Sequence, residues 1–321
     1  KVAMGAGDDR LILSVTGGGA SNHISVDGGT GSNTFVTASS HGTTTANTFQ
    51  SFANFQTYEV EGTSATTHDF TSMAGVQTVV VATGEPGFGG WDTTLQDLAA
   101  NASVIVSGKN QTVGNASNGG QVFGTISILG ADATPTDTTL HVKLDNTARV
   151  DGTLTVDHLL IGDLPGDPNP IRTLELESAG QRSTSNVVTD LNAATVDNFI
   201  LSGSQDLSVD LTAAANTAAG PANTHSLLVD GTTLTGDLTL SIDGGLLSAV
   251  DAGTTSIATL RGTAGAHDLL HLYGPVLTTG DTHVSGFETI QFGALMGADS
   301  AAGTFNATNV SGVTLYDISY I

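Results

Sequence analysis

The chain has 321 residues, and 8 lysines and arginines against 31 aspartates and glutamates give it a net charge of −23. Such a chain offers no basic surface to a nucleic-acid backbone, and its apolar runs are far shorter than the ~20 residues of a membrane-spanning helix. We therefore expect no nucleic-acid binding and no membrane insertion, and a charge partly neutralised by divalent cations.

The first glycine-rich stretch, MGAGDDRLI (residues 4–12), matches the calcium-binding nonapeptide x-G-x-G-x-D-x-U-x, where U is a large apolar residue. Gly5 and Gly7 occupy the glycine positions, Asp9 the ligand position and Leu11 the buried position. Glycines permit turns that point carbonyls inward, and the aspartate adds a charged oxygen to the all-oxygen shell that calcium prefers.

The stretch DGGTGSNTFV (residues 27–36) fits the same pattern with Gly29 and Gly31, but Asn33 replaces the aspartate. A third, less complete match at residues 17–25 also has an asparagine, Asn22, in the ligand position. Asparagine supplies a neutral oxygen, so we expect weaker calcium binding rather than none.

The spacing of these stretches indicates how they stack. If one turn of the chain takes ~24 residues, Asp9 and Asn33 lie on one edge of a coil and Asn22 on the other. A calcium ion between Asp9, Asp27 and Asn33 is then predicted. The alternative is that all three stretches are ordinary glycine-rich turns without metal.

Helix signals are scarce and fall in two places. DTTLQDLAAN (92–101) has Asp92 or Thr93 as N-cap, with Gln96 completing a capping box, and predicts a helix inside an insertion at 84–120. TDLNAATVDN (189–198) is a weaker candidate for a single helical turn.

Strand signals dominate the rest of the chain. Apolar residues alternate with Thr, Ser, Asp or Lys, which predicts strands with one buried face, and most strands end at Gly, Asn or Asp. The segments are LHVKL (140–144), LTV (154–156), LELES (174–178), FILSGS (199–204), LSVDL (207–211), SLLVDG (226–231), DLTLSIDGG (237–245) and IATLRG (257–262).

Acidic turns between these strands are further candidate calcium ligands. GDLPGDPNP (162–170) offers Asp163 and Asp167 on a proline-stiffened loop, and Asp243 lies in one of several Asp-Gly turns between 230 and 251. We expect one or two of these turns to bind calcium and the others only to form turns.

The strand spacing predicts an all-β fold, an irregular right-handed parallel β-solenoid with Gly/Asp-rich turns and one or two short helices. Two strands per turn of ~20–25 residues fit the pattern. A β-sandwich is the alternative, because its short strands have similar spacing. The scarcity of aromatic residues, 5%, and of two-residue hairpin turns favours the solenoid.

A search for catalytic residues finds little. HDLLH (267–271) is similar to a zinc-binding H-E-x-x-H motif, but it is expected to be a strand, with Asp268 on the face opposite His267 and His271. Asp206 and Asp210 lie on one strand face about 13 Å apart, too far for a glycosidase pair. The prediction is that the chain is not an enzyme.

The chain resembles bacterial surface-layer proteins of the calcium-binding repeat-in-toxin type, which are exported by type I secretion. The resemblance rests on MGAGDDRLIL, DGGTGSNTFV, LLVDGTTLTGDLTLSIDGG (227–245), VSGFETIQFG (284–293) and GTFNATNVSGVTLYDI (303–318). One departure is His267, which stands in a usual aspartate position and places calcium at that turn in doubt.

The resemblance implies a structural protein that is secreted and assembles with Ca²⁺ into a two-dimensional lattice on a bacterial cell surface. Its expected partners are other copies of itself and, as a second candidate, a cell-surface polysaccharide bound through a part of the protein outside this sequence. Residues 1–40 are expected to form the calcium-binding turns and 41–321 a continuous solenoid. The alternatives are a calcium-dependent adhesin or biofilm-matrix protein and, less favoured, a polysaccharide-acting β-helix enzyme.

Overall fold

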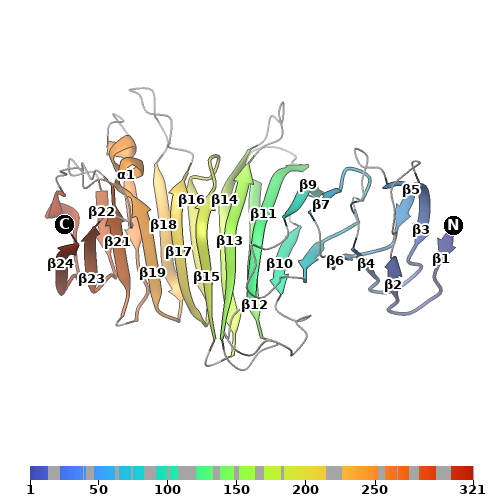
Figure 1. Cartoon of the computed structure of the whole chain (residues 1–321), viewed down its shortest axis with the longest axis horizontal. Helices are drawn as coiled ribbons and strands as arrows, with labels where there is room; N and C mark the ends of the chain where they lie inside the picture. The colour runs from blue at the N-terminus through green and yellow to red at the C-terminus, as the bar shows by residue number, and fades with distance from the viewer. Residues whose placement is uncertain are drawn as a thin grey trace.

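A computed structural model gives the fold of the chain. It describes residues 1–13, 22–38, 40, 47–61, 65–73, 75–82, 92–99, 102–107, 121–132, 138–147, 152–162, 170–181, 184–214, 226–251, 257–265, 267–274, 282–293 and 305–320. Two long parallel sheets run side by side along the molecule, with the two chain ends at opposite ends of the stack (Figure 1).

One sheet has 11 strands and the other has 10. The 11-stranded sheet contains β2 (Arg10–Leu13), β4 (Thr34–Thr37), β6 (Thr57–Val60), β8 (Thr78–Val81), β10 (Ser103–Ser107), β12 (Thr138–Asn146), β14 (Ile171–Gly180), β16 (Asn198–Gly203), β18 (Leu227–Leu234), β20 (Ala258–Arg261) and β22 (Thr282–Ser285). The 10-stranded sheet contains β7 (Thr66–Asp69), β9 (Thr93–Ala99), β11 (Gln121–Asp132), β13 (Gly152–Gly162), β15 (Thr184–Asn192), β17 (Asp206–Ala213), β19 (Leu238–Asp243), β21 (Leu269–Tyr273), β23 (Thr289–Gly293) and β24 (Leu315–Tyr320).

Three smaller elements complete the described part. A three-stranded sheet near the N-terminus contains β1 (Val2–Ala3), β3 (Asn22–Asp27) and β5 (Asn47–Ala53). A helix, α1 (Gly244–Asp251), follows β19, and a 3₁₀ turn, η2 (Ala307–Asn309), precedes β24.

Each turn of the chain, which we call a rung, adds one strand to the 11-stranded sheet and one to the sheet that faces it. The facing sheet is the three-stranded sheet in the first rungs and the 10-stranded sheet from β7 onward. Every strand pairing is parallel, and the strand order within a sheet follows the chain. This arrangement confirms the predicted parallel β-solenoid and excludes the antiparallel sandwich.

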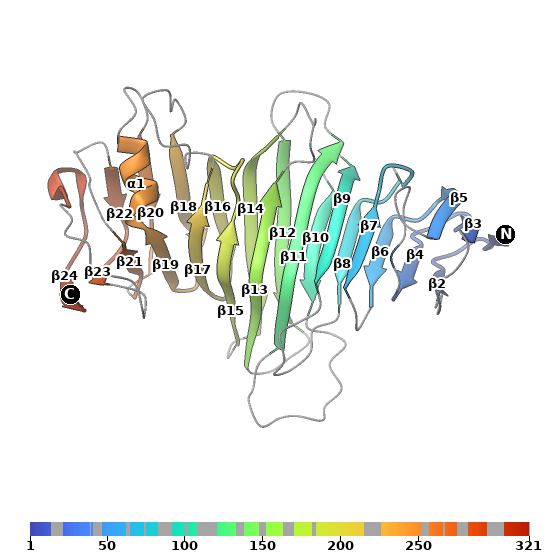
Figure 2. The same cartoon turned by 45° about the horizontal axis from the view of Figure 1, so that its top comes forward.

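Rung length varies along the stack. Arg10 pairs with Thr34 and Thr34 with Thr57, so the first rungs take 24 and 23 residues, as the sequence predicts. Ser103 pairs with His141, a step of 38 residues, so the predicted length is wrong for the middle. The strands are also longest there, reaching 12 residues in β11, and the molecule is widest at its centre (Figure 2).

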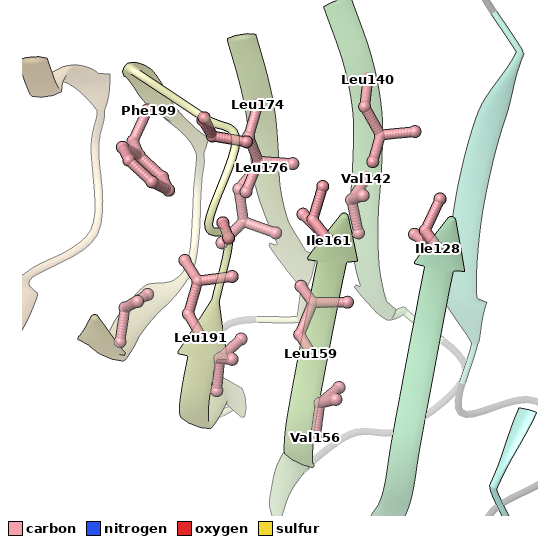
Figure 3. Packing of buried hydrophobic residues seen from close by; sticks show 14 of the residues in the cluster. Ile128, Leu140, Val142, Val156, Leu159, Ile161, Leu174, Leu176, Leu191 and Phe199 are labelled. Carbon is pink, nitrogen blue, oxygen red and sulfur yellow. The ribbon is translucent and has the colours of Figure 1, made fainter. Parts of the chain in front are cut away.

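The core lies between the two long sheets and changes composition along the stack. Near the N-terminus it is aromatic: Phe35, Phe55 and Tyr58 are fully buried, with the Phe35 and Phe55 rings 5.7 Å apart. In the middle it is built from Leu, Ile and Val side chains that point inward from both sheets (Figure 3). Small branched side chains suit this layer because successive rungs place similar residues on top of one another.

The predicted helix over 92–101 is wrong, because residues 93–99 form strand β9 between β7 and β11. Leu95 and Leu98 are both buried, and their spacing of three is helix-like. In the structure Asp97, with φ of 53°, interrupts the alternation of inward and outward side chains, so that Leu98 lies on the inner face; Gly130, opposite it on β11, also has a positive φ of 65°.

The other helix predictions also need correction. No helical turn forms over 189–198, because β15 continues to Asn192 and β16 begins at Asn198. The helix that the structure does contain, α1, begins where the sequence predicts a strand end with an Asp-Gly-Gly turn. Asp243 starts it by accepting a hydrogen bond from the Gly245 amide, 2.7 Å.

Candidate functional site

The two best-matching glycine turns lie directly on top of each other at the N-terminal end. Ala6 bridges Thr30, whose amide donates to the Gly5 carbonyl (3.2 Å) and whose carbonyl accepts from the Gly7 amide (2.9 Å). The Thr34 amide donates to the Asp9 carbonyl, 2.8 Å. The predicted stacking of Asp9 over Asn33 is therefore confirmed.

The second of the two stacked turns, which contains Gly29 and Gly31, requires glycine for a steric reason. Gly29 and Gly31 have φ of 75° and 122°, a region that other residues rarely adopt. A Cβ on Gly29 would collide with the Gly5 carbonyl oxygen, and one on Gly31 with that of Gly7. The glycines thus let two backbone turns approach closely.

Asn33 is fully buried and binds to the rungs on both sides of it. Its Oδ1 accepts from the Asp9 amide (2.9 Å), and its Nδ2 donates to the Asn54 carbonyl (2.8 Å). Its own amide donates to Oε1 of Gln56, 2.8 Å. The oxygen that the sequence assigns to calcium therefore already accepts a backbone hydrogen bond, and the side chain has a structural role.

The carboxylates of this turn pair have different surroundings. Asp8 accepts from the Ser32 amide, 2.8 Å. Asp27 accepts from the Gly29 amide and the Asn54 side chain, which hold its pKa below the usual value. Asp9 Oδ2 is buried and has no hydrogen-bond partner.

A buried carboxylate oxygen without a donor is costly, and a bound cation would remove that cost. Of the residues in these stacked turns, Asp9 therefore fits the role of a calcium ligand best. Within the described residues, no three His, Cys, Asp or Glu side chains converge as a metal site.

The remaining predicted ligands lie elsewhere. Asp243 caps α1, far along the chain from the glycine turns. Asp163 and Asp167 fall outside the described residues. The structure therefore brings together Gly5, Gly7, Asp9, Gly29, Gly31 and Asn33, with Asp27 at the end of the adjoining β3.

Asp268 is 1% exposed and points into the interior, on the face opposite His271, as the sequence predicts. Its Oδ1 accepts from the Leu238 amide (2.8 Å), and its Oδ2 accepts from both the amide (2.6 Å) and the hydroxyl (2.7 Å) of Thr263. The protein itself therefore supplies three hydrogen-bond donors to the Asp268 carboxylate.

A second set of titratable side chains lies on the outer face of the 10-stranded sheet. Between the buried residues Val188 and Leu191 of β15 there are two residues, but only Asp210 lies between their partners on β17. This bulge turns Asp190 toward Asp210 on the neighbouring strand. Bulges of this kind commonly re-aim side chains beside active sites.

Hydrogen bonds connect this set across several strands. Asp190 accepts from the Thr212 hydroxyl and pairs with His158 Nδ1 at 2.8 Å. Asp210 Oδ1 accepts from the Tyr273 hydroxyl, 2.7 Å. His271 lies in the same region, close enough to affect Asp210 electrostatically.

The surroundings of Asp210 and His271 shift the pKa values of both groups. Burial raises the pKa of Asp210 against the lowering effect of the Tyr273 hydrogen bond, and the charge of Asp190 raises it further. Burial also lowers the pKa of His271. The shift in the pKa of Asp210 has the direction expected of a proton donor.

Sequence reasoning considered Asp206 as the partner of Asp210 and missed Asp190. Asp190 lies 20 positions before Asp210, and its alignment depends on the bulge. The available signal is the sequence VVTDL, in which two polar residues separate apolar residues that both point inward.

The strands of the two long sheets differ in charge. In the described strands of the 10-stranded sheet there is no lysine or arginine, but there are nine aspartates, at positions 69, 97, 132, 157, 190, 206, 210, 243 and 317. In the 11-stranded sheet, cations pair with acids across neighbouring rungs, as in Lys143–Glu177 (3.3 Å) and Arg261–Asp230 (3.2 Å). The acidic excess is therefore concentrated in one sheet.

A shallow hollow of about 350 Å³ lies beside β20 and β22. Its lining residues are Ile257, Thr259, Arg261, His283, Val284, Ser285, Asn309 and Ser311. Arg261 is already paired with Asp230, so this hollow offers little free charge to a ligand.

Comparison of the chain with protein-family models, curated proteins and solved structures found no match. Among the described residues, no helix combines the length and the apolar character needed to cross a membrane.

Proposed function

We propose that the chain is a secreted structural protein that assembles with calcium into a lattice on a bacterial cell surface. The observation that carries this proposal is the charge of the 10-stranded sheet. Its described strands contain nine aspartates and no lysine or arginine. This acidity keeps single copies apart and soluble without calcium.

Calcium is supported by two features of the chain. In the N-terminal glycine turns, one carboxylate oxygen of Asp9 is buried without a hydrogen-bond partner. The outer face of the 10-stranded sheet carries aspartates without compensating lysine or arginine in its described strands. Divalent cations would relieve the repulsion between copies that approach through this face.

Negative-stain electron microscopy tests the proposal. The purified chain is imaged in millimolar calcium and again after chelation. Ordered sheets that disappear with chelator are the expected result. Dispersed particles in both conditions would contradict assembly and leave the adhesin as the better explanation.

A second candidate function is cleavage of a neutral polysaccharide, and the Asp190–Asp210 pair favours it. Asp190 and Asp210 lie on the adjacent strands β15 and β17, close enough for the charge of Asp190 to raise the pKa of Asp210. Retaining glycosidases use two carboxyls roughly 5–5.5 Å apart. Asp210 would protonate the leaving glycosidic oxygen, Asp190 would attack the anomeric carbon, and water would then release the sugar and return the proton.

Reducing-end release from dextran, mixed-linkage β-glucan and mannan tests this candidate. Activity that is lost in Asp190→Asn and Asp210→Asn but kept in Asp157→Asn is expected, since Asp157 lies on the same sheet without contacting the pair. No release from any of the three polymers counts against the candidate.

A further inference from the structure

We infer that the hollow beside β20 and β22 binds one ring of a neutral saccharide. This inference goes beyond the proposed function, because the hollow lies within one copy of the chain and its described lining residues include no aspartate or glutamate that would bind calcium. The two strands belong to the 11-stranded sheet and lie towards its C-terminal end (Figure 2).

Four outward side chains form the floor of the hollow. Thr259 of β20 lies beside His283 of β22, and Arg261 lies beside Ser285, in parallel register. The residues between them on each strand are buried in the core, so these four side chains point away from it. The two strands therefore hold a set of polar groups in place before any ligand arrives, which lowers the entropy cost of binding.

A third rung extends the hollow. Val310 bridges Val284 of β22, and the Ser311 amide donates to the Val284 carbonyl, 2.9 Å. This pairing carries the side chains of Asn309 and Ser311 to the edge of the same hollow. The site thus draws its polar groups from three consecutive rungs.

The floor has hydrogen-bonding capacity that the chain itself does not use. Within the part of the chain that the structure describes, no hydrogen bond involves the side chain of Thr259, His283 or Ser285. A hydroxyl both donates and accepts, and a neutral imidazole carries one donor and one acceptor. The hydroxyl groups of a sugar need the same mixture of donors and acceptors, and they would replace the water that these side chains otherwise bind.

The charge of the hollow is balanced, which selects a neutral ligand. Arg261 Nη1 donates to Asp230 Oδ2 at 3.2 Å, and Asp230 Oδ1 accepts from the Thr232 amide (3.0 Å) and hydroxyl (2.6 Å). An anion would meet a cation that is already paired, on a chain whose net charge of −23 repels it. A cation would find no carboxylate among the described lining residues. The remaining N–H groups of the guanidinium can still donate to a neutral oxygen.

The hollow also suits a sugar ring in its size and in one apolar side chain. Its volume of about 350 Å³ lies at the small end of ligand sites, which are roughly 300–1,000 Å³. Ile257 lines it and is 44% exposed, so the C–H groups of a sugar ring can cover this apolar surface. Because the hollow is shallow, we expect weak binding, with a Kd on the order of 1 mM.

Saturation-transfer NMR on the whole chain, with chelator present, tests the inference. The probes are the methyl glycosides of glucose, mannose and galactose, and we expect transfer to at least one of them. His283→Ala should weaken its binding about fivefold, the loss of one hydrogen bond, and Ser285→Phe should abolish it by filling the hollow. His141→Ala, which removes an exposed histidine on β12 of the same sheet, is the matched control and should bind as the natural chain does. Circular dichroism shows that each variant folds.

Asp230→Asn tests the balance of charge. The substitution leaves Arg261 without its counter-charge and keeps an oxygen for the Thr232 amide. We expect this variant to bind methyl glucuronide, an anionic sugar, at least as tightly as the neutral glycosides, whereas the natural chain favours the neutral ones. Tighter binding of the glucuronide by the natural chain would show that the ligand class is wrong.

The outcomes separate this inference from the proposed function. No transfer to any of the three neutral glycosides would overturn the saccharide site, and so would unchanged binding in both His283→Ala and Ser285→Phe. Because chelator is present, neither result depends on calcium-driven assembly. Binding without ordered sheets in the microscope would support the inference and contradict the lattice, and sheets without binding would do the reverse.

Discussion

The N-terminal and C-terminal rungs use the same hydrogen-bonding geometry with different chemistry. In the first, the Asn33 carbonyl accepts from the amides of Gln56 and Thr57, and the Asn33 amide donates to the Gln56 side chain. In the second, the Asp268 carbonyl accepts from the amides of Glu288 and Thr289, and the Asp268 amide donates to the Glu288 side chain (2.9 Å). The amide side chains of Asn33 and Gln56 at the N-terminal end therefore correspond to the carboxylates of Asp268 and Glu288 at the C-terminal end.

The surrounding donors explain the difference. Three donors surround Asp268, so a carboxylate is stable there despite complete burial. Asn33 has one amide donor for its oxygen and a carbonyl acceptor for its nitrogen, so only an amide side chain fits. The position in the rung is the same, and the local donors and acceptors select the residue.

Among these predictions, the largest loss of folding stability is expected from substituting Asp268. Asp268→Asn would place an NH₂ group against backbone donors, and Asp268→Ala would leave the buried amides of Leu238 and Thr263 without an acceptor. We expect either change to destabilise the fold by about 3–5 kcal/mol. Urea unfolding measures this, with His267→Ala, an exposed neighbour, as the control. A loss below 1 kcal/mol would contradict a structural role for this carboxylate.

Asn33→Asp is expected to cost somewhat less, about 2–3 kcal/mol without calcium. The new oxygen would face the Asn54 carbonyl where Nδ2 now donates. If a cation binds this turn, calcium should recover part of the loss, because the substitution restores the aspartate of the nonapeptide pattern. Thermal unfolding with calcium and with chelator gives both numbers. A variant as stable as the natural chain in chelator would show that the amide is not needed.

Asp210 differs from Asp268, because burial raises the pKa of Asp210 although its carboxylate accepts from the Tyr273 hydroxyl. Its raised pKa means that the folded chain binds this proton more tightly than the unfolded chain, so stability falls as pH rises above 3.8 through the folded pKa. Asp210→Asn keeps the acceptor for Tyr273 and removes the charge. We expect a gain of about 1 kcal/mol or less at neutral pH, since the group is partly solvated, and none below the unfolded pKa.

Unfolding midpoints at several pH values test the Asp210 prediction. Asp206→Asn on the same strand is the matched control. The raised pKa of Asp210 would be contradicted if Asp210→Asn were less stable than the natural chain at neutral pH, or if it gained the same stability at every pH.

The smallest change in folding stability is expected from Glu288→Gln. Gln56 makes the equivalent bond to the Asn33 amide at 2.8 Å, so Glu288→Gln should leave stability unchanged within about 0.5 kcal/mol. Glu288→Ala, which removes the acceptor, should cost more. Equal losses in the two variants would mean that the charge matters, and the proposed equivalence of the ends would fail.

Much of the fold follows from sequence pattern, and the exceptions have local causes. Alternating segments such as LSVDL predict strands, and the spacing of Asp9 and Asn33 predicts the stacking of the first two turns. The left-handed backbone of Asp97 gives β9 a helix-like spacing of buried leucines, and Asp243 starts a helix from what the sequence indicates is a turn.

The candidate sites were less predictable. The motif indicates that Asn33 is a calcium ligand, but which way a polar side chain faces depends on the donors of neighbouring rungs, 21–24 residues away. Asp190 and Asp210 meet through a bulge that only the strand register reveals.

Hydrogen exchange with mass spectrometry, with and without calcium, tests the role of the N-terminal turns most directly. We predict that calcium slows exchange of the backbone amides in residues 4–34 and leaves those around Asp268 and Glu288 unchanged, because the protein already satisfies the Asp268 carboxylate. Exchange that calcium leaves unchanged in residues 4–34, or slows equally at both ends, would contradict a calcium site at the stacked glycine turns.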